Sequence, residues 1–278
     1  MNNAVSVISN ICAGNKELNR EKILAYEEFA KTQPQIEIPV KHRIHGGMYL
    51  REITIPKDTL LTGQIYKFDH FDIMISGDVT VSTDTGERKR FTGYNCFEGL
   101  SGKKRAGYTH EDTTWITIHP FTGKDGDTIQ EFITAETFEE LAEFNASIDR
   151  ADYRSMVGNM LTTESEIRKQ VENKRDLTEL SDDYDHIKVK DSNIEGKGLF
   201  SDRKININDV ICPARLKGKR TIGGRYTNHA LKPNAKMIIS DGDVILYALS
   251  DIEINEEITV NYRNVLTMRN NEGDLCQE

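Results

Sequence analysis

Short runs in which apolar and polar residues alternate fill residues 36–134, and turns that contain glycine separate these runs. Examples are "MYLREITIP", "FDIMIS" and "DVTVST", with turns at Gly46-Gly47 and Ser101-Gly102. Successive side chains on a strand point to opposite faces, so this spacing favours strands with one buried face. Many short strands with glycine turns are typical of an antiparallel sandwich or barrel. The pattern therefore predicts a β domain over residues 36–134.

Apolar positions three and four residues apart mark two helical stretches. The first, Asn19 to Gln33, has the pattern of an amphipathic helix with Asn19 as its N-cap. The second fills residues 135–183, where Thr163 and Glu166 fit a capping box. Acidic and basic residues alternate along this second stretch, which predicts a solvated helical connector.

A second block rich in strand-forming residues follows the connector, with runs such as "HIKVK", "DVILYALS" and "EITVNY". At 278 residues the chain fits two domains, because one domain commonly holds roughly 100–200 residues. The predicted fold class is mainly β with helical segments. The predicted parts are an N-terminal segment with the amphipathic helix (1–35), a β barrel (36–134), the helical connector (135–183), a second β domain (184–266) and a flexible tail (267–278).

The composition indicates a soluble, acidic protein. A net charge of -9 at pH 7 argues against nucleic-acid binding, which needs clustered Lys and Arg, and it suits a basic, lysine-bearing protein partner. No apolar run approaches the roughly 20 residues of a membrane span, and the N-terminus lacks a signal pattern, so we expect a cytoplasmic protein that does not enter membranes. The four cysteines are Cys12, Cys96, Cys212 and Cys276. Their wide spacing indicates free thiols and no zinc site.

The second β block contains four motifs in a fixed order, which are "GKGLF" (196–200), "GRYTNH" (224–229), "KPN" (232–234) and "DIEINEEITVNY" (251–262). Each motif alone fits an ordinary turn or strand end. The ordered set resembles a SET domain, the fold of protein lysine methyltransferases. The resemblance implies a SET-like β fold with a knot-like core, in which the Asn-His loop and the "EITVNY" segment pass through one another.

This resemblance implies that the chain binds S-adenosyl-L-methionine and methylates a lysine on a protein substrate. Tyr262 matches the family's catalytic tyrosine, whose hydroxyl would orient the lysine amine. The substrate channel implied by the motifs is formed by Arg225, Tyr226 and Tyr262. The implied cofactor-binding residues are Lys197, Gly198, Tyr226, Asn228, His229 and Tyr262. No metal is implied at this site.

The substrate end of the second block departs from the family pattern. Ala230-Leu231 follow the Asn-His pair where Ser-Cys is usual, and Asn255 replaces the usual glycine. The segment before Gly223 is short, so the insert that builds one wall of the substrate groove is nearly absent. No cysteine triplet follows Tyr262, so the zinc-bound flap of many family members is missing. We therefore expect that another chain or the N-terminal domain completes the pocket, or that the lysine channel is open.

The first β block carries "GQIYKFDHFDIMISGDVTV" and, after it, "GKKRAGYTHEDTTWITIH". These segments resemble the two halves of a cupin-type jelly-roll barrel, and in particular small cupins encoded by bacteriophages. Metal-binding cupins have a His-x-His pair where this chain has Gln64 and Tyr66, while His70, His110 and His119 remain. Because the paired ligands are missing, we expect a metal-free barrel in which His70 is hydrogen-bonded.

Two uses of such a barrel stay open. It could bind a small molecule among the side chains of Tyr66, His70, Tyr108 and Trp115. It could instead form a homo-oligomer through its edge strands.

The first hypothesis for the whole chain is an S-adenosyl-L-methionine-dependent protein-lysine methyltransferase of minimal SET type, fused to a degenerate cupin. The alternative is a non-catalytic structural or interaction protein, for example a phage-encoded assembly or virion component that keeps both folds as binding modules. The location is then the host cytoplasm or the virion. A metal-dependent cupin enzyme is a third reading, and the missing His pair disfavours it.

Overall fold

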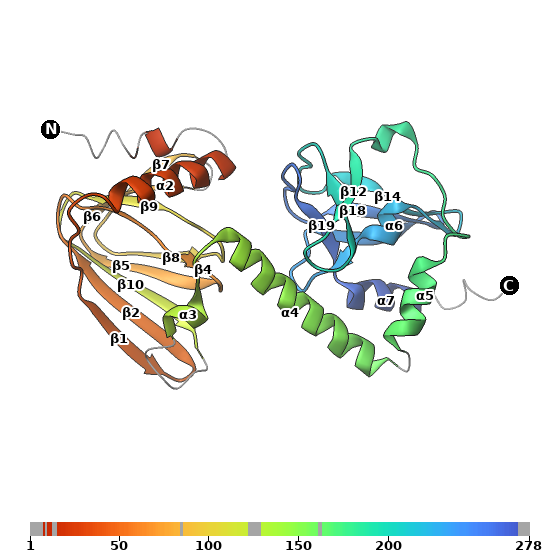
Figure 1. Cartoon of the computed structure of the whole chain (residues 1–278), viewed down its shortest axis with the longest axis horizontal. Coiled ribbons are helices and arrows are strands. Elements are labelled where there is room, and N and C mark those ends of the chain that lie inside the picture. The colour runs from red at the N-terminus through yellow and green to blue at the C-terminus, as the bar shows by residue number, and fades with distance from the viewer. Residues whose placement is uncertain are drawn as a thin grey trace. The chain divides into compact units, whose positions relative to one another are not determined.

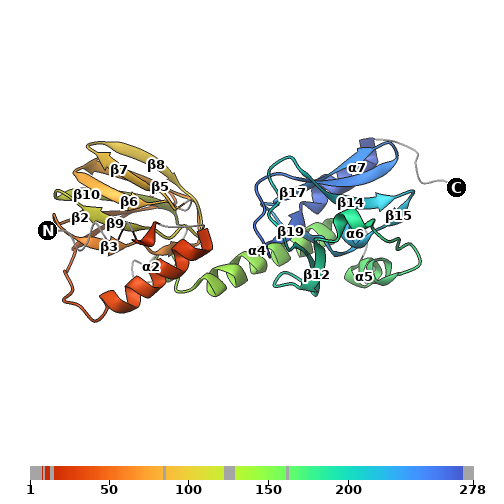
Figure 2. The ribbon, with the colours of Figure 1, turned by 90° about the horizontal axis from the view of Figure 1, so that it is seen from above.

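A computed structural model describes residues 8, 10–12, 16–83, 86–121, 129–160 and 163–271. The chain divides into two compact units, Met1–Leu141 and Ala142–Glu278. Both units consist mainly of antiparallel strands with helical segments between them, so the predicted mainly β fold class is confirmed (Figure 1 and Figure 2). The division falls within the long helix α4 (Phe138–Asn159), inside the stretch predicted as a connector.

The first unit contains two larger antiparallel sheets. The five-stranded sheet has the spatial order β1 (Val40–His45), β2 (Met48–Ile55), β10 (Thr113–Pro120), β5 (His70–Ser76) and β8 (Asn95–Gly99). The four-stranded sheet has the order β3 (Leu60–Thr62), β9 (Ala106–Thr109), β6 (Asp78–Ser82) and β7 (Arg88–Thr92). The unit also contains a small third sheet, in which β4 (Ile65–Tyr66) pairs with β11 (Thr134–Ala135), and a short helix, α3 (Ile129–Ile133).

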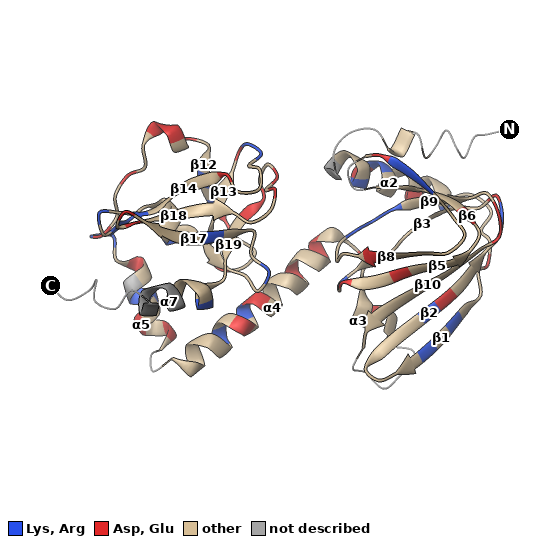
Figure 3. Ribbon diagram, turned by 180° about the vertical axis from the view of Figure 1, so that it is seen from behind, with Lys and Arg blue, Asp and Glu red and all other residues tan. Residues whose placement is uncertain are grey.

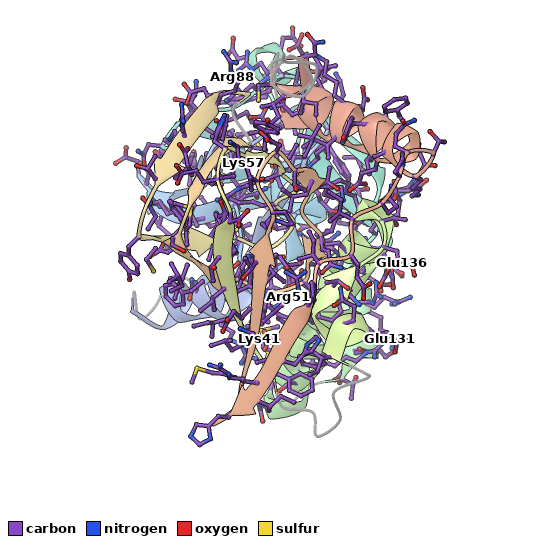
Figure 4. The ribbon with its side chains drawn as sticks, turned by 90° about the vertical axis from the view of Figure 1, so that its left-hand side faces the viewer. Lys41, Arg51, Lys57, Arg88, Glu131 and Glu136 are labelled. Atoms are coloured by element: carbon purple, nitrogen blue, oxygen red, sulfur yellow. The ribbon has the colours of Figure 1, made fainter. Side chains whose placement is uncertain are left out.

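The alternation that predicted these strands has a direct structural counterpart. Tyr49 on β2 is buried at 1% exposure, whereas its neighbour Met48 is 51% exposed. Figure 1 shows β5, β10, β2 and β1 side by side, and Figure 4 views the β1 edge with Lys41 and Arg51 labelled. Among the described strands no ladder joins the two larger sheets, so the predicted barrel is an open two-sheet jelly-roll arrangement rather than a closed one.

The helix predicted to start at Asn19 is α2 (Lys16–Ala30). Asn19 is therefore inside the helix and is not its N-cap, which corrects the prediction. Its side chain is only 3% exposed, and its amide can donate to the Ile11 carbonyl at 2.8 Å and accept from the Gly86 N–H at 2.9 Å. Ile23, one turn further on, packs in a small apolar cluster with Ile11. Burial of this helix face therefore outweighs the local capping preference of Asn19.

The second unit contains two four-stranded sheets and several helices. One sheet has the order β12 (Ile187–Asp191), β13 (Lys197–Ser201), β19 (Glu257–Val260) and β16 (Asn228–His229). The other has the order β15 (Lys219–Arg220), β14 (Val210–Leu216), β18 (Asp243–Ala248) and β17 (Ala235–Ser240). The helical elements are the second part of α4, α5 (Glu164–Glu172), the 3-10 turn η2 (Asp182–Tyr184), α6 (Ile222–Tyr226) and α7 (Tyr262–Asn271). The core is apolar and includes the fully buried Leu199, Ile211, Leu246, Ile252 and Ile258.

One strand pair in this unit is parallel. Asn228 pairs with Thr259 and His229 with Val260, which brings the Asn-His loop beside the "EITVNY" segment. Asn234 holds the same two segments together, because its amide donates to the Glu257 carbonyl at 2.8 Å and accepts the Thr259 N–H at 2.9 Å. The predicted meeting of the two segments is thus present, while the predicted knot-like threading stays a prediction.

The predicted flexible tail (267–278) begins as helix, because α7 extends to Asn271, and its remaining residues lie outside the described part of the chain. Cys12, Cys96 and Cys212 are free thiols, as predicted, and Cys276 lies outside the described residues. In the part of the chain that the structure describes, no helix has the length and apolar character needed to cross a membrane.

Candidate functional site

A cavity of about 910 Å³ lies within the second unit. The motifs of the second β block meet there, because the turn before β13, the helix α6, the strand β16 and the start of α7 all reach its wall. All predicted site residues except Gly198 line this cavity, and they are Lys197, Arg225, Tyr226, Asn228, His229 and Tyr262. Residues far apart in the sequence therefore form one site.

The glycine pair before the Asn-His loop allows α6 to pack directly on β14, beside which it lies in Figure 2. A Cβ atom on Gly223 would lie 2.6 Å from the Cys212 sulfur, and a Cβ atom on Gly224 would overlap the Ala214 carbonyl oxygen. Glycine is thus required for close approach of two backbones. The short helix is capped by Thr221, whose hydroxyl accepts the Gly224 N–H at 3.4 Å. This packing places the end of α6 at the cavity wall.

Asn228 organises the turn that precedes β13. Its amide nitrogen lies 2.8 Å from Glu257 Oε1 and 3.0 Å from Ser192 Oγ, and 3.2 Å from the carbonyl oxygens of both Glu195 and Lys197. Two amide hydrogens thus have four acceptors within reach. Burial raises the pKa of the Glu257 carboxyl, and the hydrogen bonds from Asn228 and Ser192 oppose this shift. The amide nitrogen of Asn228 therefore holds protein groups in place, and the described residues provide no hydrogen bond to its amide oxygen.

Gly198 does not line the cavity. A Cβ atom at this position would overlap the Glu257 carboxylate and crowd the Phe200 ring at 3.1 Å. The structure therefore shows why glycine is needed here, which is to make room for Glu257. Its predicted contact with a cofactor stays a prediction.

His229 connects three segments of the chain. Its Nδ1 accepts the backbone N–H of Tyr262 at 3.1 Å, so this nitrogen carries no proton. The ring proton is then on Nε2, which donates to Asp152 Oδ2 at 2.9 Å. Arg263 Nη2 donates to the other carboxylate oxygen at 2.8 Å, and the Arg263 guanidinium, with a smaller contribution from His229, holds the pKa of Asp152 below its usual range. His229 itself is 3% exposed.

Tyr262 presents a neutral phenol at the cavity. Its hydroxyl donates to the Thr227 carbonyl at 2.8 Å, and burial raises its pKa well above the usual value. The ring of Tyr153, on α4, packs edge-on against it with the centroids 6.1 Å apart. The hydroxyl is therefore a hydrogen-bonding group near neutral pH and not a base.

The stretch predicted as a solvated connector forms one wall of the cavity. Acidic and basic residues do alternate on α4, as Figure 3 shows, but the second part of α4 and α5 face the site. Their lining side chains include Asp149, Tyr153, Arg154, Ile167, Arg168 and Val171. The predicted capping box is confirmed at the start of α5, where Thr163 and Glu166 exchange hydrogen bonds. Helices that precede the second β block thus form part of the cavity wall, while completion of the pocket by another chain or the N-terminal domain, or an open lysine channel, stays a prediction.

Backbone carbonyls anchor this wall to the rest of the unit. Arg225 donates to the carbonyl of Val171 and, at 3.2 Å, to that of Asn173. Arg150 donates to the carbonyl of Asn193 at 2.8 Å. Arg225, predicted to line the substrate channel, therefore lines the cavity and also holds the end of α5.

Three residues at this site were missed by the sequence reasoning. Glu257 belongs to the motif "DIEINEEITVNY", and the adjacent pair Glu256-Glu257 in that motif was the available signal. Asp152 and Tyr153 had no such signal, because they lie on a helix whose own sequence indicates only amphipathic character.

Inside the first unit, two histidines lie close together. The rings of His70 and His119 stack with centroids 4.6 Å apart. His70 Nδ1 lies 3.1 Å from the Phe68 carbonyl oxygen, in agreement with a hydrogen-bonded histidine. His119 has no hydrogen-bond partner among the described residues, and burial lowers its pKa to about 3. No cluster of metal-ligating side chains is present in the described ranges.

The comparisons with known proteins give one family. The family model of the SET domain matches residues 54–263. The match begins within β2 of the first unit and ends at Arg263, so it also covers the block that resembles a cupin, and the assignment of one family to each half is not established. No curated protein matches the chain.

Each of three solved structures that resemble the chain covers about a third of it. A cupin superfamily protein from Desulfitobacterium hafniense has 8% identity, covers 32% of this chain and 83% of its own, and gives a TM-score of 0.28. KdgF from Halomonas sp. has 16% identity, covers 35% of this chain and 91% of its own, and gives a TM-score of 0.29. A conserved protein of unknown function from Streptococcus pyogenes has 13% identity, covers 33% of this chain and 80% of its own, and gives a TM-score of 0.27.

Proposed function

The chain belongs to the SET-domain family, and we propose that its second unit is an S-adenosyl-L-methionine-dependent protein-lysine methyltransferase of minimal SET type, preceded by a degenerate cupin-like unit. One observation carries the proposal. The motifs that resemble the family's cofactor and tyrosine segments converge on a single cavity, with the Asn228-His229 pair next to Tyr262.

The cavity fits the cofactor in size and in chemistry. Its volume of about 910 Å³ lies in the range of ligand pockets, roughly 300–1,000 Å³. The cofactor carries a sulfonium and an ammonium group, which favour carbonyl and carboxylate oxygens, and the lining residues Asn228 and Asp149 carry an amide oxygen and a carboxylate. The residues that would hold it are Lys197, Tyr226, Asn228, His229 and Tyr262. When bound, it supplies an electrophilic methyl group.

The substrate end would be the side of the cavity near Tyr262 and Tyr153. A lysine amine must be neutral to attack a methyl group in line with its leaving sulfur. The Tyr262 hydroxyl and the Thr227 carbonyl, 2.8 Å apart, can orient such an amine by hydrogen bonds, and the aromatic rings can exclude water from it. In this reaction the amine would gain the methyl group and release a proton to solvent, and the demethylated cofactor would leave as a thioether. The substrate proposed here is a lysine-bearing protein, because the acidic chain favours basic partners.

The test combines binding and turnover. Isothermal titration with S-adenosyl-L-methionine is expected to show one site, and Tyr262→Phe is expected to bind the cofactor while transfer to lysine falls roughly 100-fold or more, because the orienting hydroxyl is lost. Tyr247→Phe, on β18 at a position that does not line the cavity, is the matched control and should keep wild-type transfer. No binding at millimolar cofactor, or unchanged transfer in Tyr262→Phe, would overturn the proposal.

A non-catalytic interaction protein, for example a phage-encoded assembly or virion component, is the second candidate. One observation favours it, since apolar side chains on the first unit are exposed, with Met48 at 51%, Phe71 at 52% and Ile75 at 46%. Met48 and Phe71 project from the same face of the sheet, because their partners on β10, Pro120 and Ile118, are two residues apart. A contiguous exposed apolar patch commonly marks a contact surface, and a homo-oligomer through this unit belongs to the same proposal. The cofactor titration separates the two candidates, because only the enzyme needs the cofactor.

A further inference from the structure

One face of α4 contacts the Asn-His loop. Asp149 Oδ1 accepts the backbone N–H of Leu231 at 2.9 Å, and Asp152 Oδ2 accepts the Nε2–H of His229 at 2.9 Å. Tyr153 packs against the ring of Tyr262. Residues three and four apart on a helix share a face, so a single helix surface contacts His229, Leu231 and Tyr262.

We propose that Asp152 is a positioning residue of the cofactor site, which acts through His229 on the backbone of Tyr262. The proposal rests on the proposed function, because it assigns Asp152 a role in the same site. Asp152 does not line the cavity, whereas His229 and Tyr262 do.

The N-terminus of α7 explains why the protonation state of His229 matters. Tyr262 is the first residue of α7, and the first N–H groups of a helix have no partner within the helix. His229 Nδ1 accepts this N–H at 3.1 Å, so it caps the helix. The cap requires that Nδ1 is unprotonated, and the Asp152 carboxylate enforces this state because it can only accept a proton from Nε2.

Loss of the carboxylate would remove this constraint. An amide at position 152 can turn its N–H toward Nε2, which places the ring proton on Nδ1. Two N–H groups would then face each other at the start of α7, and the Tyr262 backbone would shift. Because the Tyr262 hydroxyl is fixed on the Thr227 carbonyl at 2.8 Å, a shift of the backbone changes the wall of the cavity.

The test uses the full chain, with histidine labelled by nitrogen-15, and reads the protonated ring nitrogen of His229 by nuclear magnetic resonance. His229→Gln assigns the signal among the seven histidines. In the wild type we expect the proton on Nε2. In Asp152→Asn we expect a detectable Nδ1–H population and a dissociation constant for S-adenosyl-L-methionine that rises roughly 10-fold or more, because a charge-assisted hydrogen bond is lost.

The matched control is Asp202→Asn. This carboxylate is exposed, lies 3.6 Å from Lys188 Nζ and does not line the cavity, so its loss should change neither the His229 tautomer nor the dissociation constant of the cofactor. Arg263→Gln is a second comparison, since it removes the ion pair to Asp152 but leaves the acceptor for His229, and the Nε2–H form should persist.

A wild-type signal with the proton on Nδ1 would overturn the proposal without any variant. An unchanged tautomer and an unchanged dissociation constant in folded Asp152→Asn would overturn it as well. If the wild type binds no cofactor, the proposed function fails, and the tautomer measurement still decides whether Asp152 positions His229.

Discussion

Individual residues set the geometry of the cavity at places where there is no room for another side chain. Gly198 leaves space for the Glu257 carboxylate, and Gly224 leaves space for the Ala214 carbonyl. Asn228 uses its amide nitrogen to hold the turn before β13. The sequence motif identified the positions of these residues, but their contacts with one another depend on the fold.

Replacement of Gly224 should destabilise the second unit. The new Cβ atom in Gly224→Ala would overlap the backbone oxygen of Ala214, which cannot move without displacing β14. We expect a loss of roughly 1–3 kcal/mol in the free energy of unfolding, the usual cost of overpacking. Gly158→Ala on α4 is the matched control, since nothing lies within 4 Å of its new Cβ atom, and alanine should stabilise that helix slightly. Urea denaturation measures the stability of both variants. A Gly224→Ala variant as stable as the wild type would contradict the close packing of α6 on β14.

Among the elements, α4 and α5 have roles that their sequences did not reveal. Both were predicted as solvated helices, and both line the cavity with one face. The capping box at Thr163 and Glu166 was predicted from four residues because a cap is a local structure. The face that each helix buries depends on partners far along the chain, such as Arg225, and no local pattern encodes this.

Removal of the cap should loosen the α5 wall. In Thr163→Ala the Glu166 N–H loses its side-chain acceptor, and we expect a local loss of roughly 0.5–2 kcal/mol. Hydrogen exchange of the α5 amides should accelerate accordingly, and cofactor affinity should fall because this helix lines the cavity. Thr163→Ser keeps the hydroxyl and should behave as the wild type. Unchanged exchange in the alanine variant would show that α5 is held by its tertiary contacts alone.

At the scale of the whole molecule, the chain consists of two units with separate cores. The SET-domain match extends over both, so family membership is a property of the chain, while the predicted chemistry belongs to the cavity in the second unit. Domains with their own cores can in principle fold alone, and multi-domain chains depart from two-state unfolding. We therefore expect two transitions, with different pH dependence.

His119 should make the first unit sensitive to acid. Its pKa is lowered from 6.5 to about 3, mainly by burial, so the unfolded chain binds the proton before the folded one. The stability that the neutral ring contributes is fully present above pH 6.5 and is lost as the pH falls toward 3, with a slope of up to ~1.4 kcal/mol per pH unit. Calorimetry between pH 7 and about 5 lies above the range in which ordinary carboxylates titrate. Over this range the stability of the first unit should depend less steeply on pH in His119→Leu than in the wild type. His45→Leu, at an exposed position, should keep the wild-type slope, and an unchanged slope in His119→Leu would refute the assignment.

The sequence by itself determined the mainly β fold class, the capping box of α5 and the positions of the motifs that meet in the cavity. These features depend on alternation, spacing and local hydrogen bonds within a few residues. Tertiary structure alone decided that Asp152 bonds to His229, 77 positions further along, that Tyr153 and α5 form a wall of the site, and that Asn19 is buried instead of capping α2. The physical reason is that contacts between distant segments depend on how two whole elements pack, and a short window of sequence contains only one of them.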